Sequence, residues 1–264
     1  MYKKSTRIML SFLNLIAFIA TVVVNTLSTT IPINNKTQNE LSDQYPNLFI
    51  PSGLTFSIWG IIYILLGIYV IYQIVISFRE NGGGRGFIEK IGILFIISSV
   101  LNIGWIFAWH YEIVWLSIIL MILLLTSLIT IYMRLNIGKS SANISEKSLV
   151  HILFSVYMGW ITIATIANAT ATLVNYGWNG FGLSEQFWAV LVISVGIIIA
   201  LAVLFSRNDI FYGLVVDWSI LGILLKRLSD IDTPTQSLII VSIVGLSVIT
   251  IGIIVQLIRR KKVY

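Results

Sequence analysis

Long apolar segments dominate this sequence and limit what it can fold into. A helix rises about 1.5 Å per residue, so roughly 20 residues cross the hydrocarbon core of a bilayer. Apolar runs of near that length occur at 8–27, 53–78, 91–109, 113–133, 149–174, 186–205, 210–225 and 237–258. Each run is too long for a strand and lacks the polar alternation of a membrane barrel. We therefore expect an all-α integral membrane protein with eight transmembrane helices.

The composition excludes most kinds of catalytic and metal-binding site. The chain is 57% hydrophobic and 11% charged, and it contains no cysteine and only two histidines. Without cysteine there is no disulfide, thiolate metal site, iron–sulfur cluster or cysteine nucleophile. His110 and His151 fall at opposite ends of their spans, so the bilayer separates them and no metal site is expected. No phosphate loop, catalytic carboxylate pair or nucleophile elbow is present, so we expect neither an enzyme nor a covalently bound cofactor.

The basic residues indicate topology rather than binding of nucleic acid. With eight spans and a cytoplasmic N-terminus, 14 of the 17 Lys and Arg lie inside, and only Lys36, Lys226 and Arg227 lie outside. This asymmetry predicts that both termini are cytoplasmic. We expect the plasma membrane of a bacterium as the location. The span at 210–225 is short, about 24 Å long, and would need snorkelling or local thinning of the bilayer. The long outer segment from Ser28 to Ile50 is expected to act as a lid.

Polar and large aromatic side chains within the spans are the natural candidates for function, because polar groups are costly in lipid. They form stripes at helical spacing, and one span holds a carboxylate. The candidates are Trp59 and Tyr63, Asn102 and Trp105, Trp160, Ala164 and Asn168, and Asp217. Counting about 1.5 Å per residue places Trp59, Asn102, Asn168 and Asp217 in one layer, about 9–12 Å from the outer surface. A cavity with aromatic walls and a few amides is typical of a site for a flat apolar ligand.

Plainer interpretations compete with this one. Asn102 and Asn168 could bridge helices, a contact that contributes about 0.6 kcal/mol on average. Trp178 and Trp188 lie near an outer loop, where tryptophan commonly anchors a protein at the headgroups. Asp217 could be neutral or paired with an amide or hydroxyl of a neighbouring helix rather than serve as a ligand contact or proton relay.

Three segments resemble one known family. They are PSGLTFSIWGIIYILLG at 51–67, NIGW at 102–105 and WITIATIAN at 160–168, and they resemble the tryptophan-rich sensory protein (TspO/MBR) family. This family includes the mitochondrial translocator protein, or peripheral benzodiazepine receptor, and forms a five-helix bundle. The resemblance implies that Trp59, Asn102, Trp160 and Ala164 line a pocket for porphyrins and isoquinoline-type ligands. The other matching positions are Tyr63, Gly67, Trp105 and Asn168.

The resemblance covers the first five spans and sets the remaining expectations. Residues 1–178 would form the five-helix bundle and 179–264 an extension of three helices. We expect a membrane receptor that holds a small hydrophobic ligand such as a tetrapyrrole, porphyrin or haem, in the lipid bilayer, with a homodimer implied by relatives. Degradation of porphyrin rests on family analogy alone. No Lys or Arg follows Tyr176 within five residues, so sterol binding is not expected. The alternative is a small secondary transporter or export accessory protein that uses Asp217.

Overall fold

The computed structural model describes residues 2–79, 85–230 and 235–261, and no strand occurs in these ranges. The long helices are α1 (Lys4–Thr30), α3 (Ile58–Phe78), α5 (Leu94–His110), α6 (Val114–Leu135), α8 (Ile152–Asn175), α9 (Glu185–Arg207), α10 (Ile210–Ser229) and α11 (Gln236–Lys261). Each one corresponds to a predicted span, so the all-α prediction is confirmed. The sequence also predicts turns at NGGG (81–84) and at the segment that ends with Pro234, but residues 80–84 and 231–234 lie outside the described residues.

Short helices connect or extend the long ones. They are η1 (Ile33–Asn35), α2 (Gln38–Asp43), η2 (Gly53–Ser57), α4 (Gly86–Ile91), α7 (Ile144–Glu146), η3 (Lys147–His151) and η4 (Gly180–Gly182). The third predicted span is interrupted at Gly92, which has φ +53° and separates α4 from α5. The seventh extends further than predicted, because α10 has 20 residues and ends at Ser229. At about 30 Å it is long enough for a bilayer without local thinning.

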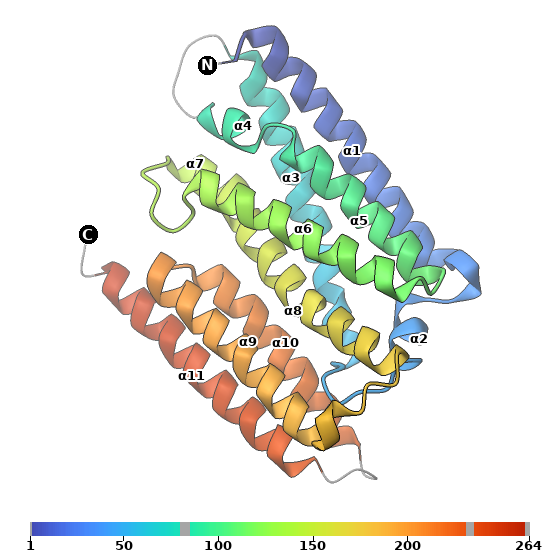
Figure 1. Ribbon diagram of the computed structural model, residues 1–264. Helices are drawn as coiled ribbons and strands as arrows, with labels where there is room; N and C mark the ends of the chain where they lie inside the picture. Colours follow the sequence, from blue (N-terminus) through green and yellow to red (C-terminus); the bar gives the residue numbers. More distant parts are fainter. Residues whose placement is uncertain (1, 80–84, 231–234, 262–264) are drawn as a thin grey trace.

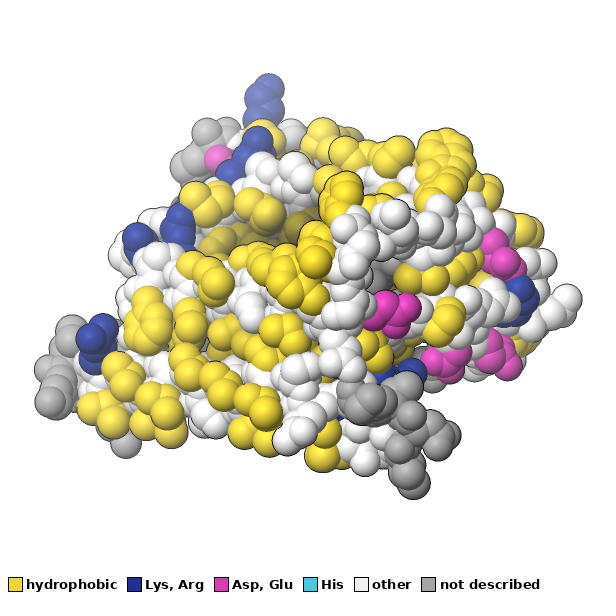
Figure 2. All heavy atoms as spheres, turned by 60° about the horizontal axis from the view of Figure 1, so that its bottom comes forward, with side chains coloured by type: hydrophobic (Ala, Val, Ile, Leu, Met, Phe, Trp, Pro, Cys, Tyr) yellow, Lys and Arg dark blue, Asp and Glu magenta, His cyan; other side chains and the backbone are white. Residues whose placement is uncertain are grey.

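The outer surface is that of a multi-pass membrane protein. Among the described residues, six helical segments are long and apolar enough to span a membrane, and α5 is a shorter apolar helix of 17 residues. Helix α10 is not among the six, so the full set of eight transmembrane helices stays a prediction. Large apolar side chains such as Ile16, Ile64 and Ile198 are more than 60% exposed, as expected for groups that face lipid. Figure 2 shows Lys and Arg side chains mostly at one end of the molecule and most Asp and Glu at the other. The start of α1 and the end of α11 lie on the same side (Figure 1).

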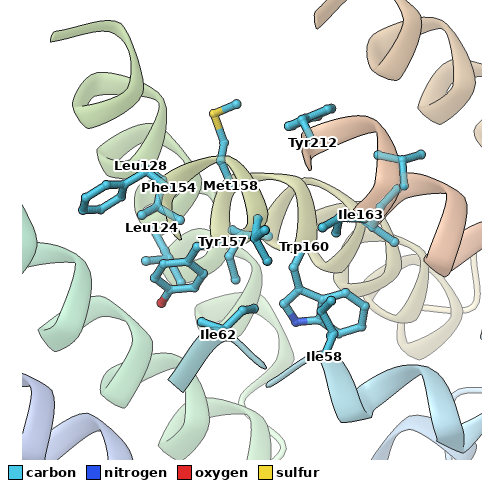
Figure 3. Close-up of a cluster of buried hydrophobic side chains, with 14 of the residues drawn as sticks. Ile58, Ile62, Leu124, Leu128, Phe154, Tyr157, Met158, Trp160, Ile163 and Tyr212 are labelled. Atoms are coloured by element: carbon cyan, nitrogen blue, oxygen red, sulfur yellow. The ribbon is translucent and has the colours of Figure 1, made fainter. Parts of the chain in front are cut away.

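Helix α8 is the centre of the packing. Trp160 points from α8 toward Ile58 and Ile62 of α3, and Tyr212 of α10 lies on the opposite side of α8, near Met158 (Figure 3). Helix α6 also packs on α8, and α1 packs against α3 and α5. The hairpin between α5 and α6 is as short as the sequence predicts. It closes at Glu112, which has φ +58° and whose backbone N–H donates to the carbonyl of Trp109.

The last three helices pack on one another, and of the three α10 packs most extensively on the rest of the described structure. Helices α9, α10 and α11 lie side by side, and α10 packs along α8 (Figure 1). Gly159 of α8 permits this close approach, since a Cβ there would lie 3.2 Å from the Cβ of Val215. The division of the chain at residue 178 stays a prediction.

Asp209 joins α10 to two helices of the bundle. The side chain is 3% exposed. Its Oδ2 accepts hydrogen bonds from the hydroxyls of Tyr132 (2.9 Å) and Ser155 (2.6 Å), on α6 and α8. Its Oδ1 accepts from the backbone N–H groups of Phe211 and Tyr212 and caps α10. One carboxylate therefore both starts α10 and fixes its position against the bundle.

We predict that Asp209→Ala lowers the stability strongly, by roughly 3–5 kcal/mol, because several buried donors lose their acceptor at once. Thermal denaturation of the purified protein in detergent measures this. The control is Asp43→Ala, whose side chain is 65% exposed and pairs with Lys226, and which should change stability by less than about 1 kcal/mol. Equal midpoints for the two variants would contradict the bridging role of Asp209.

Candidate ligand-binding site

An aromatic cavity lies in the half of the bundle away from the N-terminus of α1, between α3, α5, α8 and the segment that follows α1. Its free interior is about 60 Å³, enough for a few water-sized atoms. The lining residues are Gln38, Ser42, Asn47, Ile50, Pro51, Phe56, Trp59, Trp105, Trp109, Trp160, Ile163, Ala164, Ala167, Asn168 and Ala171. Five of the eight predicted positions, Trp59, Trp105, Trp160, Ala164 and Asn168, are thus brought together.

Trp59 is the hub of the aromatic walls. Its ring stacks on Trp105 at 6.3 Å between centroids and on Tyr63 at 5.7 Å, and it meets Trp160 edge-on at 6.0 Å. Phe56, on the turn before α3, also meets Trp160 edge-on at 5.9 Å. Such offset and edge-to-face pairs contribute about 0.5–1.5 kcal/mol each beyond burial. The walls therefore present flat faces that are held in place by their neighbours.

Two indole N–H groups on these walls have no acceptor. The Nε1 atoms of Trp105 and Trp160 are buried and find no hydrogen-bond partner among the described residues. A buried donor without an acceptor costs about 1–3 kcal/mol. Asn168 is also buried, and its Oδ1 accepts a hydrogen bond from Ser117 at 3.1 Å. The unpaired donors thus belong to two tryptophans that line the cavity.

The other three predicted residues lie elsewhere. Asn102 is fully buried, and its Oδ1 accepts a hydrogen bond from the amide of Asn25 on α1 at 2.9 Å, so it joins two helices behind the wall. Tyr63 lines a neighbouring groove between α1 and α3, which shares Trp59 with the cavity. Asp217 lies on α10, where its Oδ2 accepts from Thr250 of α11 at 2.8 Å. It does not line the cavity.

A loop segment lies over the mouth of the cavity. The sequence predicts a lid from Ser28 to Ile50, but α1 continues to Thr30, and we use the word lid for residues 37–52, which include α2. Thr37 and Glu40 form a capping box at the start of α2, and the backbone N–H and hydroxyl of Thr37 lower the pKa of the Glu40 carboxyl. Tyr45 packs on Trp109 with ring centroids 5.5 Å apart. Burial and the nearby charge of Glu112 raise the pKa of the Tyr45 hydroxyl. Leu41 is fully buried, so the lid is a packed element.

Helix α10 holds the lid and the turn that follows it. The backbone N–H of Ser52 donates to the carbonyl of Gly222 at 2.9 Å, and the indole of Trp218 donates to the carbonyl of Thr55 at 3.0 Å. A salt bridge of 3.1 Å joins Lys226 to Asp43 on α2. No local sequence pattern predicts these contacts, because they join segments more than 160 residues apart.

A profile for a family described as "TSPO-like protein" matches residues 11–255. The chain belongs to the TSPO-like family. The matched region runs from the first turns of α1 into the last turns of α11, so it includes all eight long helices of the described structure. This TSPO-like protein therefore matches its family over the C-terminal helices as well as over the aromatic bundle. No curated protein and no solved structure matches the chain.

The tightest contact between α10 and the turn before α3 is at Gly222, where a Cβ would lie 1.9 Å from the Oγ1 of Thr55. We predict that Gly222→Ala pushes the two segments apart and lowers the thermal midpoint, although alanine is otherwise the better helix former. The matched control is Gly196→Ala in α9, where the nearest atom is 3.8 Å away, and it should be neutral or stabilising.

A second substitution identifies the cause. Thr55→Gly in the Gly222→Ala background removes the atoms that clash, so it should restore part of the lost stability. Loss of stability that is the same with and without Thr55→Gly would show that the close contact is not the reason for glycine at this position.

Proposed function

We propose that this TSPO-like protein is a membrane receptor that binds a flat aromatic ligand, such as a porphyrin or haem, in the aromatic cavity. The observation that carries the proposal is the pair of buried indole N–H groups of Trp105 and Trp160, which lack acceptors on the wall of a cavity built from aromatic faces. A tetrapyrrole offers both features that this wall would recognise, because it has a broad apolar face for stacking and carboxylate oxygens for the donors.

The ligand would enter by displacement of the lid. Pockets that hold small-molecule ligands usually measure about 300–1,000 Å³, whereas the free interior here is about 60 Å³. The bundle side of the cavity consists of helices packed on α8, while the lid is tied to α10 through backbone and surface contacts. Moving this short segment would expose its buried side chains, such as Leu41 and Phe49, but would leave the long helices in contact, so the lid is the part that would move.

Quenching of tryptophan fluorescence by protoporphyrin tests the proposal on purified protein. Trp160→Phe keeps an aromatic ring but removes one donor, so we predict that it weakens binding about five- to tenfold, the value of one hydrogen bond. The control is Trp115→Phe, which removes a lipid-facing indole that is 53% exposed and should leave the affinity unchanged. Saturable binding with the same affinity in both variants would exclude this cavity as the site.

We also infer that the end bearing the termini faces the cytoplasm, since basic side chains gather there (Figure 2). The chain has no cysteine, so single introduced cysteines can report the side. We predict that a membrane-impermeant maleimide added to intact cells labels Ser237→Cys and not Ser5→Cys. Labelling of the second variant alone would reverse the orientation.

The transporter alternative rests on Asp217 and stays a prediction. The structure pairs this carboxylate with Thr250 between α10 and α11, away from the lining of the aromatic cavity. We therefore give the receptor proposal precedence.

A further inference from the structure

A second cavity lies at the outer ends of α8 and α9. Its volume is about 420 Å³, within the range of small-molecule pockets. One wall is the lid at Leu48 and Phe49, and another is the end of α8 at Leu173 and Val174. It shares only Asn47 with the aromatic cavity. The two are therefore distinct cavities that meet at one loop.

The third wall consists of two tryptophans held in a tight turn. Trp178 and Trp188 meet at a ring distance of 4.8 Å and an angle of 60°. The indole of Trp188 donates to the carbonyl of Gly180 at 2.9 Å, and a Cβ at Gly180 would lie 3.0 Å from that nitrogen. Gly180 also has φ +62°, which favours glycine. The turn thus fixes both indoles at the cavity. Indole faces attract cations, most strongly where water is displaced.

Glu185 lines the same cavity and has no basic partner among the described residues. The other acidic residues at this end of the described structure are satisfied locally. The pairs are Glu112 with Lys36, Asp43 with Lys226, Asp230 with Arg227, and Glu40 with the N–H and hydroxyl of Thr37. A lone carboxylate beside two indole faces is the arrangement that recognises an organic cation.

The position of the cavity adds a requirement on the rest of the ligand. Glu185 is the first residue of α9, at its polar outer end, and the deeper lining is apolar and includes Ala189 and Val192. A charged group would therefore lie at the surface and an apolar body would extend along α8 and α9. An anionic amphiphile would meet Glu185 with like charge, and a neutral lipid tail would make no use of the carboxylate.

We propose that this cavity is a second binding site, for an amphipathic monovalent cation such as a quaternary ammonium or phosphonium ion with apolar substituents. Its charge lies between Glu185 and the indoles of Trp178 and Trp188, and its apolar groups fill the space between the lid and α9. This site is additional to the proposed porphyrin site and does not depend on it.

Equilibrium dialysis of tetraphenylphosphonium against the purified full chain in an uncharged detergent tests the proposal. The wild type should bind it saturably, and Glu185→Gln, which keeps the shape of the side chain, should weaken binding about tenfold through loss of the ion attraction. The matched control is Glu40→Gln. It removes a carboxylate from the same end of the molecule but preserves the capping box, since glutamine also serves there, and it should bind like the wild type.

A neutral analogue separates charge recognition from apolar partitioning. Triphenylphosphine oxide should bind the wild type more weakly than tetraphenylphosphonium and should not distinguish Glu185→Gln from the wild type. Absence of saturable binding, or equal affinity of the cation for the wild type and Glu185→Gln, would overturn the proposal. Protoporphyrin binding measured on the same samples should be unchanged by Glu185→Gln, so the two proposed sites succeed or fail separately.

Discussion

Helices in lipid gain little by burying apolar surface against one another, because the acyl chains are as apolar as the side chains. Their relative positions must then be set by close backbone approach and by hydrogen bonds. In this protein a few such contacts hold helices in their relative positions. Asp209 ties α10 to α6 and α8, Asn25 joins α1 to α5 through Asn102, and Gly222 lets α10 touch the turn before α3. The aromatic cavity lies where helices placed by these contacts meet.

Much of the helical layout is predictable because each span can be recognised by itself, from its length and its apolar composition. The errors came where a local pattern was ambiguous. Lys226 and Arg227 look like the start of a loop, yet they are the last turn of α10, where basic residues complement the helix dipole. Gly92 falls within the span predicted at 91–109, although its positive φ marks a break between helices. Both features depend on how a helix ends, and a count of apolar residues does not predict where that happens.

Side-chain placement was predictable in part. Spacing along α8 brought Trp160, Ala164 and Asn168 onto one face, and the structure places all three on the cavity. Depth alone also grouped Asn102 and Asp217 with them, but depth does not say which way a side chain turns around its helix. Phe56 and Trp109 also belong to the walls, but they are not among the predicted site residues. Trp109 nevertheless continues the stripe of Asn102 and Trp105 at helical spacing. The partners of α10 required the three-dimensional arrangement.

The loop at Asn47 has a consequence for how the two cavities behave together. The side chain of Asn47 bonds to the backbone on both sides, to the carbonyl of Tyr45 and the N–H of Phe49, so these hydrogen bonds hold residues 45–49 together as one short turn. It forms part of the wall of each cavity. If both proposed sites hold ligands, a ligand that shifts this turn on one side would reshape the other side, and thermodynamic linkage would then require the two ligands to change each other's affinity by the same factor. One asparagine turn would thus couple the two proposed sites.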